Sequence, residues 1–240
     1  MRRSLFLLVI FLTAASLQAS TLLSEGFDDI TTLAGSGWVR TNNSSPLGVS
    51  NWFQGDPNIF LSETGANDSY IAANFLNADF GGDISNWLLT PVITIDNGEV
   101  LTFFTKTDVN PSSTPDNLEV RLSTNGASTN VGATATSLGD FASLLFSVNP
   151  ALTTTGYPSG WTQVTVTLSG LGGPTTGRFA LRYVVPNTAN NGDYIGIDTL
   201  TVTTAGAIPE PSTAVLLLFG GIAGGLMFRR RVLAGSANLK

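Results

Sequence analysis

Residues 178–183, Arg-Phe-Ala-Leu-Arg-Tyr, alternate polar and apolar side chains, and this period of two decides the fold. The alternation recurs in Gln-Val-Thr-Val-Thr-Leu at 163–168 and in Asn-Leu-Glu-Val-Arg-Leu-Ser at 117–123. Because successive side chains of a strand point to opposite faces, the pattern is typical of antiparallel strands with one buried face. We therefore expect Arg178 and Arg182 to lie on a solvent-exposed face.

More apolar stretches at 70–76, 87–95 and 100–106 are candidate central strands. Between the last two, Asp-Asn-Gly-Glu at 96–99 is typical of a hairpin turn. No long stretch has the 3.6-residue period of an amphipathic helix. About ten short strands predict an all-β protein, a jelly-roll-like or immunoglobulin-like antiparallel β-sandwich. Without cysteine the chain lacks the Cys…Trp…Cys spacing that would favour the immunoglobulin version.

The composition of the 240 residues excludes several kinds of chemistry. With no Cys and no His, the chain forms no disulfide and no Cys/His zinc site, and no Cys nucleophile or His base can serve catalysis. Residues 20–208 hold five basic and sixteen acidic side chains, a net charge of −11. Such a surface repels phosphate backbones, so we expect no nucleic-acid partner.

The first residues have the pattern of an export signal. Arg2 and Arg3 precede an uninterrupted apolar run at 5–12, and small residues follow as far as Ala19. A positive start, a short apolar stretch and a small-residue exit predict a signal peptide over 1–19. Eight apolar residues are too few to span a hydrocarbon core of about 30 Å.

The other end has the pattern of a second targeting signal. Pro209, Glu210 and Pro211 precede an uncharged stretch at 213–228, which as a helix is about 24 Å long. The arginine cluster Arg229, Arg230 and Arg231 follows directly. The order predicts a transmembrane helix whose basic end lies in the cytoplasm.

This arrangement at 208–233 resembles the PEP-CTERM protein-sorting signal of Gram-negative bacteria. The resemblance implies export, passage through the inner membrane, processing by the transpeptidase exosortase and a link to exopolysaccharide export. Residues 234–240 would form a cytoplasmic tail.

The intervening domain, 20–207, has a resemblance of its own. Its pieces are Ser-Glu-Gly-Phe-Asp at 24–28, Asn-Trp-Phe-Gln-Gly at 51–55, Trp-Leu-Leu-Thr-Pro at 87–91, Asp-Asn-Leu-Glu-Val-Arg-Leu-Ser at 116–123 and Tyr-Ile-Gly-Ile-Asp-Thr-Leu at 194–200. In this order they resemble the choice-of-anchor J domain, which is similar to cleaved-adhesin and MAM jelly-roll domains of surface proteins. We expect Trp87 to be buried and to anchor one sheet against the other.

Two candidate sites follow from strand phase. Trp52 and Phe53 are adjacent, so on a strand one of them points outward and could stack on a sugar ring. Glu25 shares a face with apolar neighbours, and Asp198 shares a phase with Leu200. Ile195 and Ile197 have the opposite phase, which predicts a bulge near Asp198 or a strand buried on both sides. If the first and last strands pair, these acids with Asp28 could bind a structural calcium ion. The alternative is that Glu25 caps backbone amides and that Asp198 lies at a turn.

No acidic pair stands out as catalytic, so we nominate no catalytic residue. The reading that the sequence favours is a non-catalytic exported protein of the cell surface or extracellular matrix, associated with exopolysaccharide. The alternative is a carbohydrate-binding or adhesin module, and the third choice is a glycoside-active enzyme.

Overall fold

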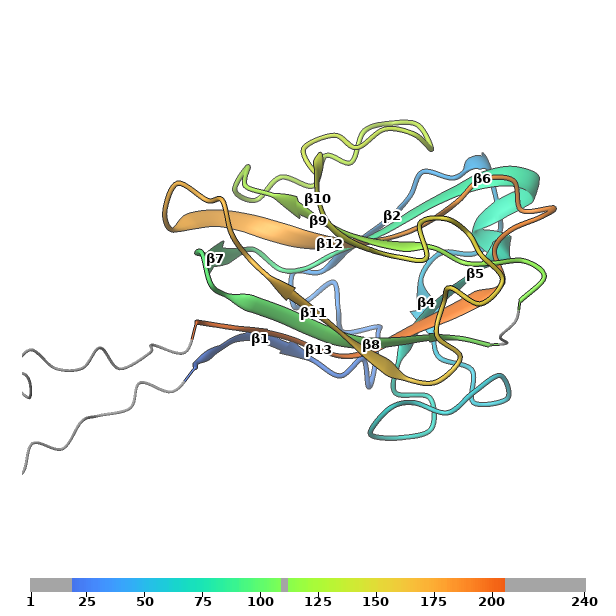
Figure 1. Ribbon diagram of the computed structural model, residues 1–240, viewed down its shortest axis with the longest axis horizontal. Helices are drawn as coiled ribbons and strands as arrows, with labels where there is room; N and C mark the ends of the chain where they lie inside the picture. The colour runs from blue at the N-terminus through green and yellow to red at the C-terminus, as the bar shows by residue number, and fades with distance from the viewer. Residues whose placement is uncertain (1–18, 109–111, 206–240) are drawn as a thin grey trace, which may run out of the picture. The chain divides into compact units, whose positions relative to one another are not determined.

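The computed structural model describes residues 19–108 and 112–205, which form two antiparallel sheets packed face to face (Figure 1). The predicted all-β sandwich is thereby confirmed. The signal peptide, the sorting signal and the tail lie outside the described residues, except for Ala19. Within the described ranges no helix is long and apolar enough to cross a membrane.

The first sheet has six strands, with β13 near its centre. In sheet order these are β11 (Thr162–Thr167), β8 (Val100–Thr107), β13 (Tyr194–Thr203), β5 (Ile71–Asn74) and β4 (Phe53–Gln54), with β1 (Thr21–Glu25) also paired to β13.

The second sheet has seven strands, with β12 at its centre. Its order is β10 (Ser143–Val148), β9 (Leu118–Ser123), β12 (Thr175–Val185), β6 (Ala78–Leu89) and β2 (Val39–Asn42); β3 (Ser45–Leu47) pairs with β6, β7 (Ile93–Ile95) pairs with β12, and the short helix η1 (Phe75–Asn77) precedes β6.

The three strands with the clearest alternation, β9, β11 and β12, are confirmed, and the candidate strand at 87–95 is divided. It breaks at Pro91, which has no N–H for a ladder, so β6 ends at Leu89 and β7 begins at Ile93. The turn at 96–99 is not a hairpin, because β7 lies in the second sheet and β8 in the first. It carries the chain across the core instead.

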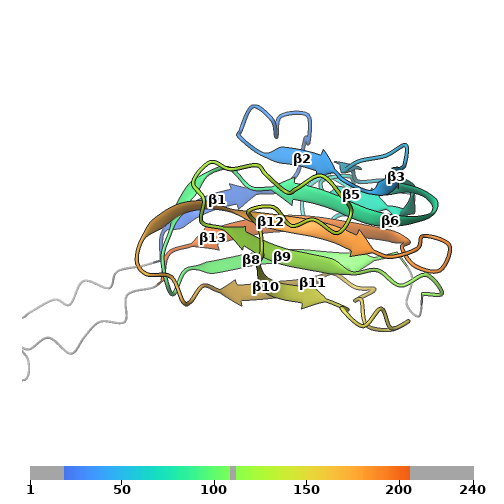
Figure 2. The same ribbon diagram turned by 90° about the horizontal axis from the view of Figure 1, so that it is seen from above.

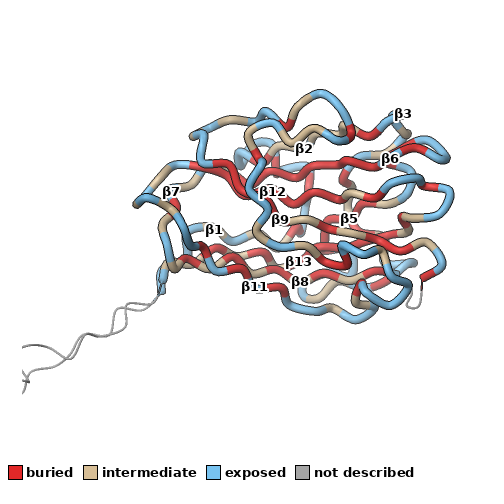
Figure 3. Tube along the Cα trace, turned by 45° about the horizontal axis from the view of Figure 1, so that its top comes forward, coloured by how far each residue is buried: buried red, intermediate tan, exposed pale blue. Residues whose placement is uncertain are grey.

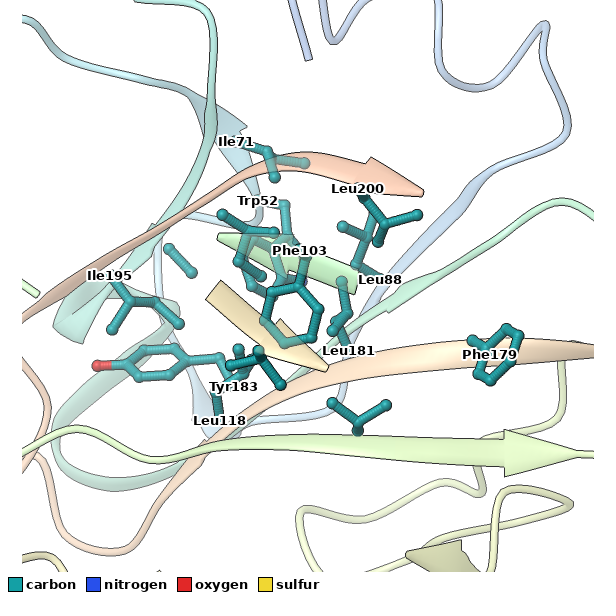
Figure 4. Close-up of a cluster of buried hydrophobic side chains, with 14 of the residues drawn as sticks. Trp52, Ile71, Leu88, Phe103, Leu118, Phe179, Leu181, Tyr183, Ile195 and Leu200 are labelled. Carbon is teal, nitrogen blue, oxygen red and sulfur yellow. The ribbon is translucent and has the colours of Figure 1, made fainter. Parts of the chain in front are cut away.

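The main core lies between the two sheets (Figure 4). Phe103 of β8 and Leu200 of β13 meet Leu88 of β6 and Leu181 of β12, and all four are fully buried. On each strand these residues belong to the set of alternate positions whose side chains point toward the other sheet.

The outer face of the second sheet is also covered, which sequence periodicity did not reveal. Arg178 and Arg182 are on this outer face, as predicted, but both are buried rather than solvent-exposed. The loop at 124–142 covers part of the face, and Arg182 donates to the Ala135 carbonyl oxygen at 2.6 Å. Alternation specifies the face of a strand, but a distant loop determines whether water reaches it.

Trp87 is fully buried, but it does not join the two sheets. It points outward from β6 and packs with Phe141, Val131 and Leu89 beneath the same loop. The Arg182 guanidinium lies 4.8 Å from its ring centroid. The neighbouring Leu88 faces the main core in its place. The expected burial of Trp87 is confirmed, but the expectation that it anchors one sheet against the other was wrong.

The outer face of the first sheet has a second cover, the loop at 55–69. Phe60 from this loop stacks on Tyr70 at 4.9 Å between ring centroids, next to Tyr194 of β13. Burial therefore extends beyond the sandwich interior on both sides, as the red segments of Figure 3 show.

The first and last strands lie side by side, as expected. β1 pairs with β13, with Glu25 opposite Leu200. The register of β13 against β8 shifts between Asp198 and Thr201, and Thr199 has a φ of 48°. This bulge lets Ile197 and Leu200 both face the core, so Asp198 lies on the outer face and not, as predicted, on the face of Leu200.

Replacing Trp87 with alanine should destabilise the domain by about 3–5 kcal/mol, because a cavity would open beneath the loop at 124–142. Trp87→Phe keeps an aromatic ring there and should cost much less. Chemical denaturation followed by circular dichroism measures both. A cost for Trp87→Ala below about 1 kcal/mol would contradict the packing described.

Candidate functional site

The predicted glycan contacts fall on opposite sides of the first sheet. Trp52 is only 2% exposed and belongs to the main core, so the prediction that it stacks on a sugar ring is wrong. Phe53 is half-buried on the outer face, with its ring centroid 5.7 Å from that of Tyr194.

The rings around Phe53 form a covered cluster. The Tyr70 hydroxyl contacts the carbonyl oxygens of Asp56 and Phe60 as well as the Tyr194 hydroxyl, and burial raises the pKa of Tyr70. Trp161 donates its Nε1–H to the Leu61 carbonyl. These contacts fasten the loop at 55–69 to the sheet, so the cluster is a second small core rather than an open platform.

The predicted calcium ligands approach the same loop. Asp198 accepts hydrogen bonds from the backbone N–H groups of Glu63 and Thr64 at 2.8 and 3.2 Å. Asp28 lies beside Gly65, and Glu25 accepts the N–H of Phe27 at 2.8 Å. In the described part of the chain no three acidic side chains gather as a metal site. For Glu25 the contact matches the alternative, in which it caps a backbone amide. Asp198 lies within β13 rather than at the turn that the alternative expected, and it accepts amides of the loop at 55–69.

Asp116 is the titratable group with the most unusual environment. Its carboxylate is fully buried and accepts hydrogen bonds from the hydroxyls of Thr107 and Tyr183, both at 2.6 Å, and from the N–H of Asp193 at 2.7 Å. Burial raises the pKa of Asp116 to about 6, although these hydrogen bonds act to lower it. A carboxyl so enclosed cannot reach a substrate, and we assign it a structural role.

The most exposed apolar group lies at the end of the sandwich where β13 begins. Five side chains line a groove of about 330 Å³, together with Asp79 and Thr188. They are Leu47, Val49, Phe75, Leu76 and Phe80, with Val49 90% and Phe80 85% exposed.

Backbone contacts hold the groove open. Leu47 pairs with Ala78, and Gly48 and Ser50 donate their N–H groups to the carbonyls of Asn77 and Leu76. A Cβ at Gly48 would lie 2.1 Å from the Leu76 carbonyl oxygen, so only glycine permits this approach. Sequence reasoning missed the groove, although Phe80 directly before two glycines was an available signal of an exposed ring.

Large contiguous apolar patches on a soluble domain usually mark interaction sites. The groove offers two aromatic rings, aliphatic walls and one carboxylate, Asp79. This set suits contact with the apolar face of a ligand. Its lining holds no nucleophile paired with a base.

Comparisons with known proteins match one segment of the sequence and the fold of the sandwich. Residues 207–231 match the model of the PEP-CTERM protein-sorting motif. That motif implies export, membrane anchoring before processing, and an exosortase-type processing enzyme. Among curated protein sequences none matches the chain.

Solved structures show the fold. The K3 cleaved adhesin domain of Lys-gingipain from Porphyromonas gingivalis is 21% identical, with a TM-score of 0.52, and the match covers 78% of this chain and 99% of that one. The K2 domain of the same protein is 16% identical, with a TM-score of 0.51 and coverage of 76% and 99%. The chain therefore shares its sandwich with adhesin domains, and this likeness shows the fold alone.

Calcium binding by Glu25, Asp28 and Asp198 stays a prediction. It requires that millimolar calcium raise the melting temperature and that a chelator lower it, since an ion bound only by the folded form stabilises that form. Asp198→Asn should abolish the difference. Equal melting temperatures with calcium and with chelator would leave these carboxylates as hydrogen-bond acceptors.

The Asp116 carboxyl should make a contribution to stability that is lost as the pH rises from about 4 to about 6. In that interval the folded state holds a proton on Asp116 that the unfolded chain, with a carboxyl pKa near 3.9, has already released. Burial, and next the Asp108 carboxylate, also raise the pKa of Asp193. The Asp193 carboxyl therefore changes the stability of the domain with pH in the same direction as Asp116.

Asp116→Asn should flatten most of this slope, measured as urea midpoints at about pH 4.5 and pH 7. The Thr107 hydroxyl can then donate to the Tyr194 carbonyl, 3.1 Å away. An unchanged slope in this variant would contradict the assignment.

Proposed function

We propose that this chain is a non-catalytic exported protein of the cell surface or extracellular matrix, associated with exopolysaccharide. The observation that carries the proposal is the sorting motif at 207–231, which follows directly on an adhesin-like sandwich. In this proposal the signal peptide at 1–19 is removed on export. The apolar segment then holds the precursor in the inner membrane until an exosortase-type enzyme cleaves near Pro209.

The geometry of the sandwich suits a molecule held at one end. Ser20 and Thr204 hydrogen-bond to each other, so both described chain ends leave from the same end (Figure 1). The groove with Phe80 lies at the opposite end, beside the start of β13.

We assign the groove to glycan contact, with Phe80 and Phe75 stacking on apolar sugar faces. This deepens the adhesin or carbohydrate-binding alternative and places the contact at residues other than Trp52. With a net charge of −11 the domain fits a neutral glycan better than an anionic one. We also propose that residues 20–207 are a choice-of-anchor J domain, on the sequence resemblance and the adhesin-like fold.

Processing is tested at the tripeptide. The mature protein should lack the residues from about Pro209 onward, and Glu210→Ala should leave the full-length precursor in the inner membrane. Ser212→Ala, just outside the tripeptide, is the matched control and should be processed normally. Mass spectrometry of the surface fraction reads the outcome, and peptides from 232–239 on the mature protein would contradict it.

Glycan contact is tested at the groove. Phe80→Ser should weaken retention in exopolysaccharide isolated from the producing cells on the order of tenfold, since burying a phenyl ring contributes about 1.5–3 kcal/mol. Leu61→Ser changes another exposed apolar side chain, 55% exposed in the loop at 55–69, and should have no effect. Equal retention of both variants and the parent would remove the groove from the proposal.

A further inference from the structure

The edges of the two sheets differ in how they are protected. Exposed sheet edges invite pairing with other chains, and proteins usually blunt them with bulges, charges, proline or shortness. Most edge strands in the described part of this chain carry one of these devices. β4 has two residues and β7 three, β10 and β1 have register shifts, β2 contains Arg40 and β3 contains Pro46.

β11 has none of these devices. Thr162–Thr167 pairs with β8 over six consecutive positions without a register shift, and it contains neither charge nor proline. In a domain with sixteen acids this uncharged edge is unusual. Its other side has no strand partner among the described residues, where β11 pairs with β8 alone, and Gln163, Thr165 and Thr167 are all exposed.

The hydrogen-bonding phase of β11 can be derived from its end. Leu168 donates its N–H to the Glu99 carbonyl at 2.8 Å, so the even-numbered residues bond to β8. In an antiparallel ladder the intervening residues direct their N–H and C=O groups the other way. The backbone groups of Gln163, Thr165 and Thr167 therefore point away from the sheet.

We propose that β11 pairs antiparallel with β11 of a second copy of this chain, about a two-fold axis at Thr165. In this register Thr165 lies opposite Thr165, and Gln163 lies opposite Thr167. The hydrogen-bonded pairs are all formed by residues whose backbone groups point outward. Between these pairs Val164 lies opposite Val166, with both side chains on the core side. The register thus places no charge opposite another charge, and its Thr–Thr pair is of a favourable kind.

An apolar groove beside β11 adds to this surface. Figure 2 shows β10 and β11 along the same side of the sandwich. Between them lies a groove of about 440 Å³, lined in part by Phe146, Val148, Pro158 and Val164. Leu144 and Phe146 of β10 are 51% and 41% exposed. A second copy seated on β11 would bring its own β10 to this side, so that these side chains cover each other.

The pairing has a geometric consequence, which rests on the proposed surface location. β11 runs from the groove with Phe80 toward the end where Ala205 leaves the domain, as β13 does. An antiparallel pair therefore directs the two chain ends in opposite directions. Such a pair suits molecules on two facing surfaces, or molecules released into the matrix.

The natural absence of cysteine makes the register testable in the full-length chain in detergent. Hydrogen-bonded partners have Cα atoms about 5.5 Å apart, within disulfide range. With a mild oxidant such as copper–phenanthroline, Thr165→Cys should form a disulfide-linked dimer on non-reducing gels. Gln163→Cys is the matched control on the same face. Its two copies would lie about 14 Å apart and should stay monomeric.

The double variant Gln163→Cys/Thr167→Cys should cross-link again, because those positions face each other. Melting temperatures equal to the parent's show that the variants fold. Cross-linking of Thr165→Cys no stronger than that of Gln163→Cys, including none in either, overturns the proposed pairing. Since the precursor itself is used, this result is independent of export and processing. The cross-linking result would remain interpretable even if Glu210→Ala did not block processing of the precursor.

Discussion

The Glu119 carboxylate, on the outer face of the second sheet, holds two arginines from different strands. Its oxygen lies 2.7 Å from Nε of Arg121 and 3.1 Å from Arg182. Burial acts to raise the pKa of Glu119, but the two ion pairs outweigh it and keep the pKa below its usual value. The guanidinium groups in turn bind the carbonyls of Ala135, Phe141 and Ala142 in the covering loop. One partly buried anion thus orients the two arginines that fasten the loop covering the sheet.

The first sheet uses different chemistry for the same purpose. There the loop at 55–69 is held by stacked rings, by tyrosine hydroxyls and by the Asp198 carboxylate, which accepts two of its amides. The bulge in β13 makes this possible, because it turns Asp198 outward while the flanking aliphatic residues stay in the core. The two covers shield part of each outer face, while the ends of the sandwich and the β10 and β11 side stay accessible.

Each proposed role is assigned to a different accessible surface. The end nearest Ser20 and Ala205 carries the tether, the opposite end carries the apolar groove, and the β11 edge offers unpaired backbone groups. A rigid sandwich keeps these surfaces apart, so glycan contact and self-association need not compete.

The sequence by itself determined the elements whose signal is local. Alternation at 117–123, 163–168 and 178–183 identified three strands, and the sorting motif was legible as an ordered run of residues. Only the tertiary structure decided what covers each strand. Trp87 and Arg182 were placed by a loop about fifty residues away in sequence, and Asp198 by a one-residue bulge. A period of two records which residues share a face, but it cannot record what packs against that face, because the contacts come from distant segments.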